Sequence, residues 1–180
     1  MLIPFIVEFI YDEENSTFLS SSALTTFIGI LLILTNLEEN RKLNLQQAFL
    51  LTTLSWLSIA VFGSIPFIFS DLNLSIVDSF FESMSGITTT GSTIIVNLES
   101  TPKSILIWRA ILQWLGGIGV IVMAITILPL LNVGGMQLFK KDQVSYASEK
   151  ILPKTREVTL VISIIYLVLT LTCGAAYWFV

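Results

Sequence analysis

The sequence predicts an all-α integral membrane protein, and three observations support this fold class. Of its 180 residues 54% are hydrophobic, and the mean hydropathy is +0.84. Only 12% are charged, whereas a soluble domain carries roughly 25%. The charges are also clumped, which leaves apolar runs long enough to cross the ~30 Å hydrocarbon core of a bilayer. A water-soluble globular domain is therefore excluded.

The charge balance and the residue inventory exclude further classes. The net charge of −4 gives no basic surface for nucleic acid. There is no His, and Cys173 is the only cysteine, so no disulfide forms within the chain. A metal site of imidazole or thiolate ligands, a His-based catalytic centre and a bound cofactor are not expected. We expect a protein that is not an enzyme.

Five apolar stretches are predicted to be helical. The first, Leu2–Ile10, covers only about half a bilayer at 1.5 Å per residue. Acidic rather than basic residues flank it, which does not fit a signal peptide. The other four are long enough to span: Phe18–Leu34, Leu45–Phe69, Ile105–Leu131 and Val158–Val180. Because the first is half a span and the last has no polar flank, we expect a fragment of a longer membrane protein.

The basic residues predict how these spans are oriented. Lys and Arg occur in the loops 36–44 and 133–157 but not in the loops around Asp12 and Asp71. Short loops rich in Lys and Arg face the cytoplasm, so both basic loops are expected there. If residues 72–103 crossed the membrane fully, the two loops would lie on opposite sides. The charges therefore favour a re-entrant segment that enters and leaves by the outer face.

This segment is predicted to begin with a short helix. Ser75 and Asp78 have the spacing of a capping box, and apolar residues follow at helical intervals up to a stop near Gly86. A helix of about twelve residues is near 18 Å long, which is too short to cross a bilayer.

Residues Thr88, Thr89, Thr90 and Gly91, here called the Thr/Gly segment, are predicted to be extended, with Gly91 free to adopt a positive φ. Non-helical backbone at membrane depth must be buried in protein or line a watery cavity. An extended segment would turn its carbonyl oxygens toward one axis, where they replace the water shell of a cation. The negative end of the preceding helix would face the same place. The alternative is a Thr-rich turn that joins two helices at the outer surface.

Three blocks carry a resemblance to a known family. They are FFESMSGITTTGS at 80–92, WRAILQWLGGIG at 108–119 and ILPLLNVGGMQL at 127–138. In order and spacing they resemble the Trk/Ktr family of potassium-uptake proteins, on its TrkH/TrkG branch, and the likeness extends along nearly the whole chain. The resemblance implies four units, each an outer helix, a pore loop and an inner helix, around a single pore, preceded on this branch by an added helical pair.

The resemblance also implies how the chain is divided. Residues 1–36 would be a partial N-terminal transmembrane hairpin, and 37–136 the whole first unit. Residues 137–155 would be a cytoplasmic linker, and 156–180 the outer helix of an incomplete second unit. Thr88 to Gly91 would form one quarter of a potassium filter, with K⁺ at the carbonyls of Thr89, Thr90 and Gly91.

The implied function is potassium uptake across a prokaryotic inner membrane, with K⁺ as the substrate. The implied partners are the remaining pore units, a second copy of the chain and a TrkA-like cytoplasmic nucleotide-binding regulatory subunit. Two alternatives stay open, namely a Ktr-like, sodium-linked symporter subunit and a helical membrane scaffold that transports nothing.

Two further features have competing interpretations. Arg109 and Glu82 are predicted to form an ion pair between the short helix and the inner helix, because buried charges in a bilayer are usually paired. Alternatively, Arg109 extends toward the outer headgroups. Gly116, Gly117 and Gly119 form either a gating hinge or a site of close helix packing.

Overall fold

The computed structural model describes residues 1–13, 16–35, 45–127 and 147–179. The chain divides into two units, Met1–Gly117 and Ile118–Val180, each of which is described by itself. Regular structure in the described residues is helical throughout. The helices, in chain order, are α1 (Leu2–Ile10), α2 (Thr17–Thr35), α3 (Leu45–Phe69), α4 (Ile76–Ile87), the 3₁₀ helix η1 (Leu98–Ser100), α5 (Lys103–Ile127) and α6 (Ala147–Trp178).

In the part of the chain that the structure describes, four helices have the length and apolarity to cross a membrane, which confirms the predicted fold class. The qualifying windows are Thr17–Thr35, Phe49–Phe69, Lys103–Ala124 and Glu157–Trp178. The predicted half-span coincides with α1, and α3 has the predicted bounds. Residues 128–131, which we expected to end the fourth span, lie outside the described part of the chain.

Helix α6 begins earlier than hydropathy indicates. It starts at Ala147, inside the segment 137–155 that the sequence predicts as a linker. Hydropathy marks where a chain leaves lipid, whereas a helix continues through polar residues of high helix propensity such as Glu149 and Lys150. The rest of that predicted linker lies outside the described residues.

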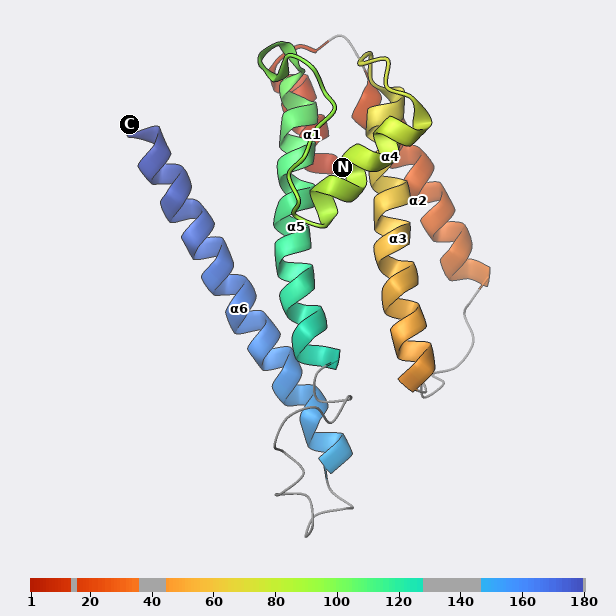
Figure 1. The fold of residues 1–180 in the computed structure, drawn as a ribbon, viewed down its shortest axis with the longest axis vertical. Helices are drawn as coiled ribbons and strands as arrows, with labels where there is room; N and C mark the ends of the chain where they lie inside the picture. The colour runs from red at the N-terminus through yellow and green to blue at the C-terminus, as the bar shows by residue number, and fades with distance from the viewer. Residues whose placement is uncertain (14–15, 36–44, 128–146, 180) are drawn as a thin grey trace. The chain divides into compact units, whose positions relative to one another are not determined.

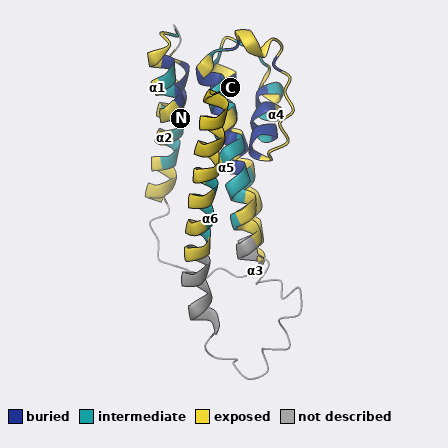
Figure 2. Cartoon of the chain, turned by 90° about the vertical axis from the view of Figure 1, so that its left-hand side faces the viewer, coloured by how far each residue is buried: buried dark blue, intermediate teal, exposed yellow. Residues whose placement is uncertain are grey.

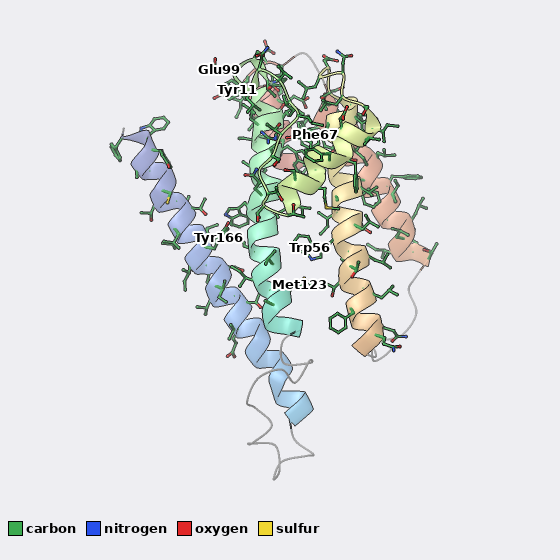
Figure 3. All side chains as sticks on the ribbon, in the orientation of Figure 1. Tyr11, Trp56, Phe67, Glu99, Met123 and Tyr166 are labelled. Atoms are coloured by element: carbon green, nitrogen blue, oxygen red, sulfur yellow. The ribbon has the colours of Figure 1, made fainter. Side chains whose placement is uncertain are left out.

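In the first unit, α4 crosses between α3 and α5, and the chain then returns to the end from which α4 started (Figure 1). The core of this unit joins helices distant in sequence. Phe18 of α2 meets Trp108 of α5 edge to face, with ring centroids 6.1 Å apart. Phe67, labelled in Figure 3 near the end of α3 that α4 follows, is fully buried in the same cluster. These contacts hold α3 and α5 in place on either side of α4.

Two acidic side chains near the N-terminus cap other helices. Glu8 accepts hydrogen bonds from the backbone N–H groups of Thr17 (2.9 Å) and Phe18 (3.3 Å) at the start of α2. Glu13 accepts one of 2.7 Å from the backbone N–H of Lys103, the first residue of α5. The first N–H groups of a helix have no intrahelical partner and carry a partial positive charge, so a carboxylate stabilises them. The loop after α1 therefore lies at the end where α5 begins.

Helix α5 is also bound to α3 through a hydrogen bond. The indole Nε1 of Trp108 donates to the carbonyl oxygen of Gly63 at 2.9 Å. Pro66 lies inside α3 and has no N–H, so one hydrogen bond of this stretch of helix is missing. The carbonyl that loses its intrahelical donor is that of Phe62, four residues before Pro66, so the hydrogen bond from Trp108 to Gly63 is a separate link between α5 and α3.

Candidate ion-binding site

Helix α4 forms as the sequence predicts. The Ser75 hydroxyl accepts a hydrogen bond from the backbone N–H of Asp78 (3.1 Å), and Asp78 Oδ2 accepts one from the backbone N–H of Ser75 (3.3 Å). This is a complete capping box. The helix has 12 residues and ends at Ile87, one residue beyond the predicted stop at Gly86. Figure 2 shows the buried face of α4 in dark blue.

The end of α4 differs from the prediction. The prediction of an extended segment is wrong at Thr88 and Thr89, which form a turn that completes the helix end. The backbone N–H of Thr89 donates to the carbonyl of Gly86 (2.9 Å), and that of Thr90 donates to the carbonyl of Ser85 (3.0 Å). This is the Schellman pattern, in which Thr89 takes the position that usually holds glycine.

The reason for this difference is the burial of the helix end. Ser85 and Gly86 are buried, so their carbonyl groups need donors from nearby backbone. That need outweighs the preference of a β-branched residue for extended backbone. Thr89 consequently has a φ of +59°, a conformation that β-branched residues rarely adopt. Gly91 has a φ of +76°, as its freedom to take a positive φ suggested.

Three consecutive carbonyl groups of the Thr/Gly segment point away from α4. The N–H groups of Thr89, Thr90 and Gly91 all donate to carbonyls of the last turn of α4, the third at 3.3 Å to Ser85. The peptide bonds of this segment are trans, and across a trans peptide the C=O and the N–H point in opposite directions. The carbonyls of Thr88, Thr89 and Thr90 therefore face away from the helix end, on the exposed side of the segment.

The chain that follows is held against α4 by two side chains. Ser85 Oγ donates to the carbonyl oxygen of Ser92 at 2.6 Å, so this carbonyl points back toward the helix. Glu82 Oε2 accepts a hydrogen bond of 3.1 Å from the backbone N–H of Ile94. Sequence reasoning did not single out Ser85 as a residue that holds this part of the chain. The available signal was its position three residues after Glu82, on the same face of a helix.

Glu82 also contacts α5. The Arg109 Nε lies 2.5 Å from Glu82 Oε1, with relative side-chain exposures of 14% and 0%. Of the two arrangements that the sequence left open for Arg109, the structure contains the ion pair with Glu82. The carboxylate of Glu82 therefore joins α4, the returning chain at Ile94 and α5.

Close packing between α4 and α5 explains two glycines, Gly86 of α4 and Gly116 of α5. A Cβ atom added to Gly116 would overlap the carbonyl oxygen of Ile87, at the end of α4. One added to Gly86 would lie 3.0 Å from the Cβ of Leu112. At Gly116 the structure favours the packing interpretation over a hinge, because only a hydrogen atom fits between α5 and the end of α4.

The ligands that this site offers are oxygen atoms. Among the described residues, no group of three or more His, Cys, Asp or Glu side chains is placed to hold a metal ion. The Thr/Gly segment presents its carbonyl oxygens, and the hydroxyls of Thr88 and Thr90 lie 2.9 Å apart. Backbone carbonyls of this kind replace the hydration shell of a monovalent cation in selectivity filters.

The fold and this site define a class of protein, a multi-pass helical membrane protein with a short helix and a returning loop between two spanning helices. Comparison with known proteins gives the family. The profile of the TrkH family, described as a cation transport protein, matches residues 14–180. The chain belongs to this family, which consists of transporters rather than enzymes, and it is a multi-pass protein of the cell inner membrane.

Individual relatives agree with this assignment. The chain is 42% identical to the Trk system potassium uptake protein TrkH of Escherichia coli K12, over 99% of this chain and 38% of that protein. It is 32% identical to the TrkG protein of the same strain, over 98% and 37%. The crystal structure of the potassium transporter TrkH from Vibrio parahaemolyticus matches with a TM-score of 0.82 and 36% identity, over 99% of this chain and 35% of that one. The chain thus spans less than two-fifths of the length of these relatives.

Proposed function

We propose that this chain supplies part of the pore-forming subunit of a potassium-uptake system, with the Thr/Gly segment as one of its filter segments. The observation that carries the proposal is the common direction of three consecutive carbonyls, those of Thr88, Thr89 and Thr90. The N–H groups of the same three peptide units, those of Thr89, Thr90 and Gly91, donate to carbonyl groups at the end of α4. The peptide dipoles of the segment therefore continue those of the helix, which makes the outward oxygens more negative.

The proposed K⁺ ligands are these carbonyl oxygens together with that of Gly91, which the family resemblance implies. A potassium filter surrounds the ion with carbonyls from several segments. One segment supplies only part of that shell, so the site requires three equivalent segments from other pore units. In this proposal residues 37–136 form one unit, 1–36 part of a preceding hairpin, 137–155 a cytoplasmic linker and 156–180 the outer helix of a second unit.

The proposed arrangement in the membrane follows the distribution of basic residues. Residues 72–103 enter and leave by the outer face, and the loops 36–44 and 133–157 face the cytoplasm. There the second loop is available to a TrkA-like nucleotide-binding regulatory subunit. We further propose that the complete protein works as a homodimer.

Growth of potassium-uptake-deficient cells at limiting K⁺ tests this function. The complete reading frame that contains this chain should restore growth, and Gly91→Val should abolish it. A β-branched residue is strongly disfavoured at a φ of +76°. Gly29→Ala is the matched control, because a Cβ atom at Gly29 meets no atom within 4 Å. Wild-type growth with Gly91→Val at normal protein level would reject a filter role and favour the scaffold alternative.

A further inference from the structure

We propose that Ser85 and Glu82 are positioning residues that hold the Thr/Gly segment on the side facing α4 and thereby set the cation selectivity of the site. The inference rests on the proposed potassium function. Neither side chain faces the ion in this account. Each acts through the backbone that it holds.

Ser85 binds both arms of the returning loop. Its carbonyl oxygen accepts hydrogen bonds from the N–H groups of Thr90 (3.0 Å) and Gly91 (3.3 Å), in the first part of the loop, directly after α4. Its hydroxyl donates to the carbonyl of Ser92 at 2.6 Å, at the start of the returning arm, the part of the loop that runs back from Ser92 toward α5. Ser85 is itself buried, with 6% relative exposure. One residue therefore determines where the row of outward carbonyls ends, because it withdraws the Ser92 oxygen from that row.

Glu82 holds the next part of the returning arm. Its Oε2 accepts the Ile94 N–H at 3.1 Å, and its Oε1 lies 2.5 Å from Arg109 Nε. Ser85 lies three residues further along α4, so both side chains stand on neighbouring positions of one helix face. The two contacts fix the returning arm at two points two residues apart, Ser92 and Ile94.

The hydrogen bonds of Ser85 and Glu82 to the loop affect selectivity because carbonyl oxygens discriminate between cations by their number and spacing. A smaller cation such as Na⁺ needs oxygens that close in on it. Oxygens whose backbone is tied to a buried helix do not move inward freely. Loss of the Ser85 hydroxyl frees the Ser92 carbonyl and loosens the segment. We therefore expect selectivity for K⁺ over Na⁺ to fall while conduction of K⁺ persists.

The test uses the complete protein in potassium-uptake-deficient cells and measures uptake of K⁺ and Na⁺ separately. Ser85→Ala should lower the ratio of K⁺ to Na⁺ uptake about fivefold to tenfold, the effect of losing one buried hydrogen bond. Ser85→Thr, which keeps the hydroxyl, should restore most of the ratio. Ser79→Ala is the matched control, because Ser79 is another buried serine of α4 and its hydroxyl has no hydrogen-bond partner in the described structure.

Glu82 has its own pair of variants. Glu82→Gln retains an oxygen for the Ile94 N–H but loses the charge opposite Arg109, whereas Glu82→Ala loses both. We expect Glu82→Ala to reduce the uptake ratio more than Glu82→Gln does. If the two reduce it equally, the charge pair rather than the hold on Ile94 is responsible, and the role assigned to Glu82 is overturned.

The outcomes separate this inference from the proposed function. A Ser85→Ala protein that transports K⁺ with the unchanged ratio of the Ser79→Ala control overturns the inference and leaves potassium transport intact. If Ser85→Ala does not accumulate in the membrane, Ser85→Cys, which has nearly the same size but is a weak donor, replaces it with the same expected fall. An unchanged ratio in that variant is equally decisive against the inference. Absence of potassium uptake in the unsubstituted protein would contradict the proposed function instead.

Discussion

The guanidinium of Arg109 pairs with the carboxylate of Glu82, 2.5 Å from Nε to Oε1, and this contact ties α5 to the middle of α4. The partners are unequally buried, since the Glu82 side chain is 0% exposed and that of Arg109 is 14% exposed. Loss of Arg109 therefore leaves the more buried charge without its counterion.

This asymmetry predicts the result of a double-mutant cycle. Arg109→Leu should destabilise the protein by about 3–5 kcal/mol, since an uncompensated buried carboxylate remains. Glu82→Gln should cost less, about 2 kcal/mol, because Arg109 is partly exposed and Gln still accepts from Ile94. The double variant should be more stable than Arg109→Leu alone. Thermal unfolding of the detergent-purified protein measures all three, and strictly additive losses would show that the pair is not coupled.

Gly116→Ala should destabilise the protein by about 1–3 kcal/mol, the range for overpacking a close contact. The added methyl group meets the backbone oxygen of Ile87, which has no freedom to rotate away. Gly29→Ala is the control and should leave the melting temperature unchanged or slightly higher, because alanine favours a helix. A Gly116→Ala protein of normal stability with altered gating would support the hinge interpretation.

Thr89→Gly should stabilise the protein by about 1 kcal/mol, because it removes a β-branched residue from a left-handed conformation. Thr90→Gly provides the comparison, since Thr90 has no positive φ. There glycine only adds flexibility to the unfolded chain and should lower stability by about 0.5–1 kcal/mol. Melting temperatures of the two variants should move in opposite directions. Equal decreases would mean that Thr89 is not strained.

Glu13→Gln should weaken the start of α5 by about 0.5–1 kcal/mol at low ionic strength. The Glu13 carboxylate accepts from the backbone of Lys103 and Ser104 and from the Ser104 hydroxyl. Asp12→Asn is the matched control, because Asp12 is exposed and asparagine tolerates its φ of +52°. The difference between the two melting temperatures should shrink in high salt, which screens a charge–dipole interaction. A salt-independent difference would point to packing instead.

Cysteine labelling tests how the chain crosses the membrane. In a Cys173→Ser background, Asn97→Cys should react with an impermeant thiol reagent added outside intact cells, and Ser145→Cys only after permeabilisation. Asn97 lies beyond the returning arm and is exposed, whereas Ser145 lies in the basic loop 133–157. The reverse pattern, in which Ser145→Cys reacts in intact cells and Asn97→Cys only after permeabilisation, would refute the re-entrant arrangement of residues 72–103.

The site could be predicted from the sequence only in part. The start of α4 at Ser75 follows from a local rule, the capping box, and the structure has it. The Glu82–Arg109 pair was one of two arrangements that the scarcity of charges in apolar surroundings left open for Arg109, and the structure contains it. The direction of the Thr88–Thr90 carbonyls and the hold of Ser85 on Ser92 do not follow from local patterns. They depend on which donors reach the buried end of α4 after the chain has reversed.

The sequence by itself determined the all-helical membrane fold, the spanning stretches and the family, because apolarity, length and motif spacing are properties of the linear chain. Tertiary structure decided that Thr89 adopts a left-handed conformation, that Gly116 packs against Ile87, and that Arg109 turns to Glu82. These outcomes depend on contacts between helices distant in sequence. The physical reason is that each buried polar group bonds to whichever partner the fold brings within reach. Where this requirement conflicts with the backbone propensity of a residue, the hydrogen bond prevails.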